Sequence, residues 1–252
     1  MLNFSLKDKV TIITGASRGI GEAIATVFAE NGAKCILVSR KQDSISKIAE
    51  KIKENGYFAD AIACHIGYPE QIKELYSKIK HKYKRLDILV NNAATNPHFG
   101  GILDADQGVW DKIMDVNVKG PFFMTKYGVK LMLESGKGSV LNISSVNAEK
   151  PGLMQGVYSI SKASLVSMTK VFAKELAPFN IRVNALLPGL TDTKFSKAII
   201  NNKEICDFVI KQIPMGRYAK PFEMVGAALY FVSDAASYTT GSCLCCDGGF
   251  LL

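Results

Sequence analysis

Short runs of apolar, mostly β-branched residues recur along the chain and alternate with longer amphipathic stretches. The runs that predict strands are residues 10–14, 35–38, 88–90, 140–143 and 181–185. Because helical stretches separate them, the pattern predicts an α/β fold, with helices covering both faces of a parallel, doubly wound sheet. No linker, repeat or low-complexity tract interrupts the alternation, so we expect one domain over residues 1–252.

Two helical stretches differ in how their apolar residues are arranged. In the first, a single stripe ends before Gly32 and consists of Ile20, Ala23, Ile24, Val27 and Phe28. One face of this helix should pack on the sheet. In residues 157–176 the apolar residues cover more than one face, so we predict that one side meets the sheet and the other a second subunit.

The alternation breaks between Pro188 and Pro221. Long excursions in compact domains usually cover functional sites, so we expect a helical lid at about 190–215. Its apolar residues are Phe195, Ile199, Ile200, Phe208, Val209 and Ile213. This lining suits a small hydrophobic ketone, aldehyde or acyl chain. The alternative is a helix packed permanently on the core.

A glycine-rich turn follows the first predicted strand directly. Its residues are Gly15, Ser17, Arg18, Gly19, Ile20 and Gly21, in a G-x3-G-x-G spacing that differs from the general dinucleotide fingerprint. Glycines permit positive φ and close approach to a pyrophosphate, and the following helix N-terminus presents free N–H groups. The turn therefore predicts dinucleotide binding, the alternative being a tight turn whose glycines serve packing.

The end of the second predicted strand indicates which dinucleotide binds. An acid there binds the 2′-hydroxyl of NAD, whereas basic residues accommodate the 2′-phosphate of NADP. The chain has Ser39, Arg40 and Lys41, with no carboxylate before Asp43, and Arg18 adds charge nearby. We therefore predict NADP(H) rather than NAD(H), the alternative being a basic helix start on the surface.

Tyr158 and Lys162 stand four residues apart on a predicted helix and so project from one face. A neighbouring ammonium favours the phenolate, and we expect it to lower the pKa of Tyr158 toward the working range of an acid-base catalyst. Ser145 follows a predicted strand at the edge of the sheet where α/β proteins bind ligands, and Asn117 lies in a nearby segment.

Composition narrows the range of partners and locations. The 252 residues include 31 Lys and Arg against 23 Asp and Glu, a net charge of +8 that favours anionic ligands. The densest basic run, residues 78–85, continues an amphipathic helical pattern, so we interpret it as a solvated face and expect no nucleic acid partner. We see no apolar run long enough to span a membrane and no secretory signal, and we expect a cytoplasmic protein.

Six cysteines are present, which without an export signal we expect to be reduced thiols. The sequence Cys-Leu-Cys-Cys at 243–246 could suggest a metal, but no second pair of ligands accompanies it. We therefore predict no metal site and interpret these residues as a buried strand.

Taken together, these motifs resemble the short-chain dehydrogenase/reductase family over essentially the whole chain, and within it the NADP-dependent carbonyl and retinol reductases. Further segments carrying the resemblance are Cys64-His65-Ile66-Gly67 and residues 91–100, which begin Asn91-Asn92-Ala93-Ala94. The resemblance implies a seven-stranded doubly wound sheet, a homotetramer and a catalytic tetrad of Asn117, Ser145, Tyr158 and Lys162. Two departures are His65, which replaces the usual Asp at the adenine amine, and Ala94, which replaces a Gly.

The resemblance also implies further cofactor contacts. Asn91 is expected beside the adenosine. The other positions implied are His65, Ile66, Asn92, Ala93, Pro188, Gly189, Thr191 and Thr193, in addition to Tyr158 and Lys162.

The implied activity is the reduction of a carbonyl by hydride transfer from NADPH, with Tyr158 as general acid. Ser145 would hydrogen-bond the carbonyl oxygen, Lys162 would hold the ribose, and Asn117 would position a water that resupplies the proton. An alternative is the reduction of 3-oxoacyl groups on acyl carrier protein, which Lys130 and Lys174 would dock; these could equally be exposed helix lysines. A third possibility is a binding module that senses NADP(H) without catalysis.

Overall fold

The computed structural model describes residues 3–252, and within them it contains one seven-stranded sheet in which every pairing is parallel. The strand order is β3-β2-β1-β4-β5-β6-β7. The strands are β1 (Val10–Thr14), β2 (Lys34–Ser39), β3 (Ala59–Ala63), β4 (Ile88–Asn91), β5 (Gly138–Ile143), β6 (Ile181–Pro188) and β7 (Cys243–Cys246). The predicted doubly wound α/β fold is confirmed.

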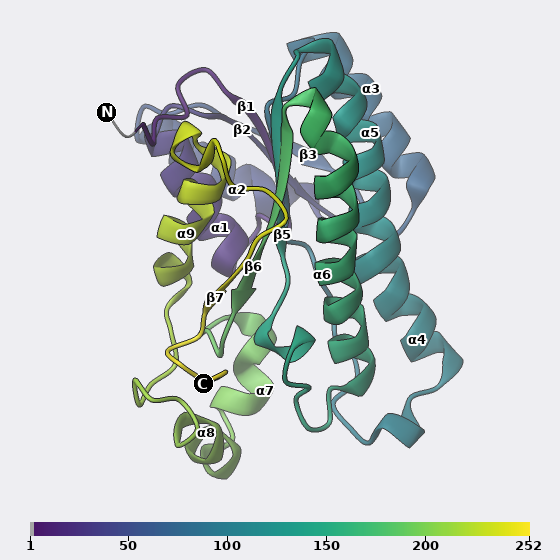
Figure 1. Ribbon diagram of the computed structural model, residues 1–252, viewed down its shortest axis with the longest axis vertical. Helices are drawn as coiled ribbons and strands as arrows, with labels where there is room; N and C mark the ends of the chain where they lie inside the picture. Colours follow the sequence, from purple (N-terminus) through teal and green to yellow (C-terminus); the bar gives the residue numbers. More distant parts are fainter. Residues whose placement is uncertain (1–2) are drawn as a thin grey trace.

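Helices cover both faces of this sheet (Figure 1). On one face lie α1 (Gly19–Glu30), α2 (Gln42–Glu54) and α9 (Val225–Val232). On the other lie α3 (Pro69–Tyr83), α4 (Gln107–Met114), α5 (Gly120–Glu134) and α6 (Gly156–Leu176). Two short helices, α7 (Lys197–Ile200) and α8 (Lys203–Ile210), lie beyond the carboxyl ends of the strands (Figure 1).

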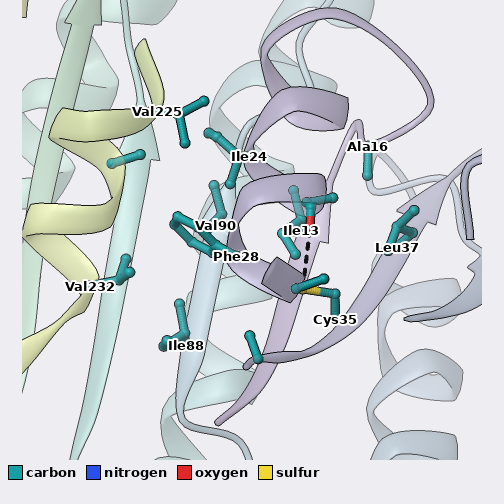
Figure 2. Packing of buried hydrophobic residues seen from close by; sticks show 14 of the residues in the cluster. Ile13, Ala16, Ile24, Phe28, Cys35, Leu37, Ile88, Val90, Val225 and Val232 are labelled. Atoms are coloured by element: carbon teal, nitrogen blue, oxygen red, sulfur yellow. Dashed lines mark hydrogen bonds between the residues drawn. The ribbon is translucent and has the colours of Figure 1, made fainter. Parts of the chain in front are cut away.

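The stripe predicted on the first helix forms part of the core. Ile24 and Phe28 of α1 are fully buried in a cluster that also holds Val90 of β4 and Val225 of α9 (Figure 2). The remaining members of the stripe, Ile20, Ala23 and Val27, pack partly buried against the same cluster. Burying a side chain of this size contributes about 1.5–3 kcal/mol, so the stripe holds the start of α1 firmly against the sheet.

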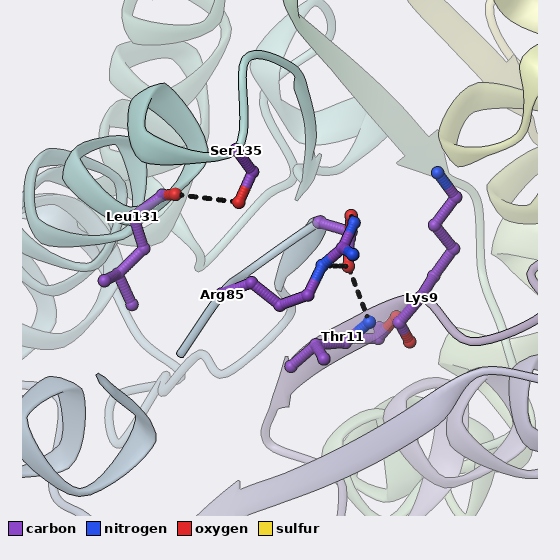
Figure 3. A network of polar contacts seen from close by, with 7 residues as sticks. Lys9, Thr11, Arg85, Leu131 and Ser135 are labelled. Carbon is purple, nitrogen blue, oxygen red and sulfur yellow. Dashed lines mark hydrogen bonds and ion pairs between the residues drawn. The ribbon is translucent and has the colours of Figure 1, made fainter. Parts of the chain in front are cut away.

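The order of the strands reverses between β1 and β4, because β1 pairs with β2 on one side and β4 on the other. At the amino ends of these strands the buried Asp87 carboxylate accepts from Val10 N at 2.8 Å and from Arg85 Nε at 3.0 Å (Figure 3). The bond from Val10 joins the two strands at their start, and the local bond from Arg85 pairs the charge of the carboxylate. Ligands in such sheets bind beyond the opposite, carboxyl ends, in the crevice where the order reverses.

Residues 243–246 form a strand as predicted, but the prediction that it is buried was wrong. Leu244 is 40% exposed and Cys245 is exposed, because β7 is the edge strand and pairs only with β6. All six thiols are free in the described chain. Over residues 3–252 no cluster of three metal-ligating side chains occurs, and no helix combines the length and apolarity needed to cross a bilayer.

Candidate active site

The glycine turn joins β1 to α1 and is fixed from the neighbouring strand. Gly15 has a φ of +67°, and a Cβ there would lie 2.8 Å from the Cα of Ala93. A Cβ on Gly21 would lie 2.5 Å from the carbonyl oxygen of Gly15. The side-chain nitrogen of Asn92 donates to the carbonyl oxygens of Thr14 at 2.9 Å and Gly15 at 3.2 Å. These contacts admit only glycine at both positions.

The first turn of α1 can receive an anion. Arg18 is its N-cap and makes no capping hydrogen bond with its side chain, so the first N–H groups have no side-chain partner. The guanidinium of Arg18 lines the same cleft. Free N–H groups, the helix dipole and a cation together form a binding site for a phosphate group.

A second basic cluster lies where β2 ends. Ser39, Arg40 and Lys41 all line the cleft, as predicted. His65, after β3, packs on Tyr68 with ring centroids 4.6 Å apart and the ring planes tilted by 48°. The pKa of His65 is lowered, first by burial and then by the positive charge of Arg40. This end of the cleft is therefore positively charged around a neutral imidazole and suits a second phosphate group.

Three of the four catalytic residues predicted from sequence come from two neighbouring parts of the chain. Ser145 is the second residue after β5, and Tyr158 and Lys162 lie in the first turns of α6. Their side chains line the cleft and are nearly buried, Tyr158 at 8% and Lys162 at 2% exposure. The Lys162 ammonium nitrogen lies 5.6 Å from the centroid of the Tyr158 ring and donates to the carbonyl oxygen of Ile143 at 2.8 Å. The structure therefore brings these three residues together.

The predicted lowering of the Tyr158 pKa by Lys162 is not found. Burial raises the pKa of Tyr158 above its usual value, and a hydrogen bond with the Ser145 side chain lowers it in part. Burial also lowers the pKa of Lys162 from 10.5 to about 7. The prediction was wrong because burial favours the uncharged form of both groups. It raises the pKa of the phenol, and it reduces the positive charge that Lys162 carries beside the phenol.

Asn117 and Asn91 both lie outside the cleft lining, unlike the prediction for each. Asn117 is 1% exposed, and its amide exchanges hydrogen bonds with the backbone of Thr95 at 2.8 and 3.0 Å and donates to Ser161 Oγ at 3.0 Å. Its side chain therefore joins the segment at Thr95 to α6, and its role in positioning a water stays a prediction. Asn91 points into the sheet, where it donates to Thr125 and Asn142, so Asn92 is the residue of this pair that reaches the cleft.

One cleft of about 1150 Å³ is lined by the glycine turn, the basic residues after β2 and the three residues Ser145, Tyr158 and Lys162. Apart from Asn91 and from Gly21, which lies beneath the turn, every predicted cofactor residue lines it, including Ile66, Pro188, Gly189, Thr191 and Thr193. The predicted lid segment lines its other side through Phe195, Ile199, Phe208, Val209 and Ile213, whereas Ile200 does not. The Phe195 ring packs on Tyr158 with centroids 5.3 Å apart.

Some lining residues were missed from sequence. Asn147 and Gln155 hydrogen-bond each other at 2.7 Å on the wall beside Ser145, and Lys150 and Phe250 lie nearby on the same wall. Phe250 is distant in sequence and comes near the cleft because the chain end returns past β7 toward α7 (Figure 1). Sequence spacing could not predict Phe250 at the cleft. Residues 146–155, in contrast, follow Ser145 so closely that their proximity to the cleft was predictable.

Comparisons with known proteins agree with this geometry. A family model described as enoyl-(acyl carrier protein) reductase matches residues 15–251. Dehydrogenase/reductase SDR family member 4 from Oryctolagus cuniculus is 40% identical over 97% of this chain and 94% of its own length. The 3-oxoacyl-acyl-carrier-protein reductase of Thermotoga maritima is 35% identical over 98% of this chain and 99% of its own.

A solved structure is also similar. It is a putative NAD(P)-dependent gluconate 5-dehydrogenase from Beutenbergia cavernae with bound NADP, at 32% identity and a TM-score of 0.95, covering 98% of both chains. The glycine turn, the Tyr158 and Lys162 pair and these similarities over nearly the full length lead to one conclusion. The chain belongs to the short-chain dehydrogenase/reductase family.

Proposed function

We propose that this chain is an NADPH-dependent oxidoreductase that reduces a ketone or aldehyde to an alcohol. The observation that carries the proposal is the convergence of Ser145, Tyr158 and Lys162 on the cleft that the glycine turn opens. These side chains can donate a proton, stabilise an oxyanion and hydrogen-bond a ribose. They line the same cleft as the N-terminus of α1, which can bind a phosphate group. This combination serves hydride transfer to a carbonyl.

The residues fit NADP(H) at both ends of the cleft. The free N–H groups of α1 and Arg18 would bind the pyrophosphate, and Ser39, Arg40 and Lys41 would bind the 2′-phosphate. The NADP bound to the similar Beutenbergia protein supports this assignment. Bound NADPH supplies a hydride to the carbonyl carbon.

The side chains then complete the reduction at the carbonyl oxygen. As the C=O π bond breaks, Ser145 Oγ donates a hydrogen bond to the developing oxyanion and the Tyr158 hydroxyl transfers its proton to it. A raised pKa suits Tyr158 to act as the acid in the direction of carbonyl reduction, because the phenol keeps its proton until the oxyanion forms. Lys162, with a pKa of about 7, can return a proton to the phenolate and also hold the ribose hydroxyls.

Arg40→Asp should reverse the choice of cofactor. A carboxylate at this position repels the 2′-phosphate, so the ratio of kcat/KM for NADPH to that for NADH should fall on the order of 100-fold. Steady-state kinetics with both cofactors measures the ratio. Lys47→Asp, the same charge change on an exposed site of α2 outside the cleft, is the control. Comparable KM values for both cofactors in the unaltered enzyme would contradict the proposal.

A panel of carbonyl compounds tests the proposed reaction directly. Absorbance of NADPH should fall with retinal or with aromatic ketones and diketones, and the alcohol should accumulate. A protein that merely senses NADP(H) would bind it without consuming it with any carbonyl. Such a binding module is disfavoured because Tyr158 and Lys162 are both present and adjacent.

The alternative substrate is a 3-oxoacyl group on acyl carrier protein. Lys130 of α5 and Lys174 of α6 are both exposed and could meet an acidic carrier, and the Thermotoga relative carries the name of such a reductase. Acetoacetyl carrier protein therefore belongs in the same panel. Turnover of the carrier substrate well above that of free ketones would favour this alternative.

We also propose that the enzyme is a homotetramer. One side of α6 is buried through Leu165 and Val166, whereas Ile160 and Val171 on its other side are 44% and 52% exposed. Phe122 of α5 is 40% exposed and packs on Phe172 of α6, which extends this apolar face. Light scattering at micromolar concentration should give about four times the 27.4 kDa chain mass. A monomeric mass would contradict the prediction.

A further inference from the structure

We propose that the substrate side of the cleft binds an anionic group through Lys150. The carbonyl compound reduced would then carry a carboxylate or a phosphate at the end away from its reacting carbon. This inference rests on the proposed function and extends it by naming a charge on the substrate and the residue that selects for it.

Lys150 is held close to the catalytic serine. It lies five residues after Ser145, and its backbone N–H donates to the carbonyl oxygen of Val146 at 2.9 Å, which closes the turn that follows β5. Its ammonium nitrogen lies 4.4 Å from the centroid of the Phe250 ring, and both side chains line the cleft. The cation is therefore placed at the cleft by the same turn that carries Ser145.

The charge of Lys150 is not neutralised by the protein. Between residues 3 and 252, no carboxylate oxygen lies within 4.0 Å of its ammonium nitrogen. Asp247, three residues before Phe250, accepts from the backbone N–H groups of Gly249 at 2.9 Å and Leu251 at 3.0 Å. The adjacent Glu149 does not line the cleft.

The other cations that line the cleft lie near the glycine turn, the end of β2, His65 or Tyr158. Arg18 lies in the glycine turn, and Arg40 and Lys41 lie at the end of β2. Lys194 follows Thr193, whose Cγ2 would lie 3.1 Å from a Cβ on Gly19 of the same turn. Lys112 acts on His65, whose pKa its charge helps to lower. Lys162 lies beside Tyr158.

The two walls of the substrate side differ in chemistry. The wall that holds Lys150 also carries the hydrogen-bonded amides of Asn147 and Gln155, next to apolar residues such as Leu153 and Phe250. The facing lid segment presents apolar side chains, among them Phe195 and Phe208. Among residues 3–252, the cleft is lined by a single carboxylate, Glu204 in the first turn of α8. An amphipathic substrate with an apolar body and an anionic end satisfies both walls.

Three matched aldehydes test the proposal: 4-formylbenzoate, 4-formylphenyl phosphate and the neutral methyl 4-formylbenzoate. Because Lys150 is exposed at the cleft, Lys150→Met should lower kcat/KM for the anions about five- to tenfold. The loss should appear in KM rather than kcat, since the anion is bound equally before and during reaction. The ester should be unaffected, and Lys150→Arg should retain the preference. If Lys150→Met lowers kcat/KM more for 4-formylbenzoate, the preferred anion is a carboxylate. If it lowers kcat/KM more for 4-formylphenyl phosphate, the preferred anion is a phosphate.

The control and a binding measurement separate this inference from the proposed function. Lys211→Met removes an exposed lysine of the lid segment that does not line the cleft, and should change none of the rates. Calorimetry of 4-(hydroxymethyl)benzoate with the enzyme–NADPH complex should show the same five- to tenfold loss for Lys150→Met. Equal effects on anions and ester, or no effect on either, would overturn the inference. Failure of all three aldehydes to oxidise NADPH would instead count against the proposed reaction, while the calorimetry still tests Lys150.

Discussion

Tyr158→Phe should reduce kcat by about 10²-fold or more while leaving the affinity for NADPH unchanged. The substitution keeps the ring that packs on Phe195 and removes only the hydroxyl that donates the proton. The oxyanion is then stabilised by Ser145 alone. Steady-state kinetics gives kcat, and fluorescence titration gives the dissociation constant of NADPH.

A matched control comes from a second buried tyrosine. Tyr76 of α3 donates its hydroxyl to the carbonyl oxygen of Met124 at 2.7 Å and does not line the cleft. Tyr76→Phe should lower stability by about 1 kcal/mol and leave kcat unchanged. If Tyr158→Phe retained kcat within a few-fold of the unaltered enzyme, Tyr158 would not be the general acid.

Lys162→Met should abolish most of the activity and at the same time change how stability depends on pH. The unfolded chain keeps the proton of this lysine up to about pH 10.5, whereas the folded chain releases it near pH 7. Between these values the unfolded state binds more protons, so the free energy of unfolding rises with pH through this one group. The expected rise is about 2 kcal/mol between pH 7 and pH 9, and it should be missing from the variant.

Urea unfolding of the cofactor-free proteins at pH 6, 7, 8 and 9 measures this difference. Below pH 7 the buried ammonium is charged in the original protein, and the variant should be relatively most stable there. Lys211→Met, at an exposed position, should follow the unaltered protein at every pH. A constant difference between Lys162→Met and the unaltered protein from pH 6 to pH 9 would show that Lys162 does not titrate in this range.

Strands rich in apolar and β-branched residues were predictable because both of their faces are buried, as in β1, where all five residues are buried. Strand β3 was not identified from its pattern. Its sequence, Ala-Asp-Ala-Ile-Ala, has little β propensity, and its strand conformation depends on pairing with β2. For β7, the four apolar residues predicted burial, but burial also requires a neighbour on the outer side, which position in the sheet decides.

The candidate site was predicted more completely than its electrostatics. Chain spacing fixes which residues reach the carboxyl edge of the sheet, and it located Ser145, Tyr158 and Lys162 there. It cannot tell how much water remains around a side chain, and the pKa shifts of Tyr158 and Lys162 follow mainly from burial. Nor could it distinguish the directions of Asn91 and Asn92, which are neighbours in sequence but point to the core and the cleft.

The hydrogen bonds of Asn117 have a consequence for how new specificities can arise in this scaffold. Its amide holds the backbone N–H and carbonyl of Thr95, not the threonine side chain, and its other contact reaches α6 through Ser161. The segment at 95–99 contributes Thr95, Asn96 and Phe99 to the cleft. Mutations can therefore alter these side chains, and with them the compounds that the cleft admits. The hydrogen bonds of Asn117 to Thr95 and to α6, the helix of Tyr158, would remain. The substrate preference can therefore change while the catalytic residues stay in place, because Asn117 bonds the backbone of Thr95 and not its side chain.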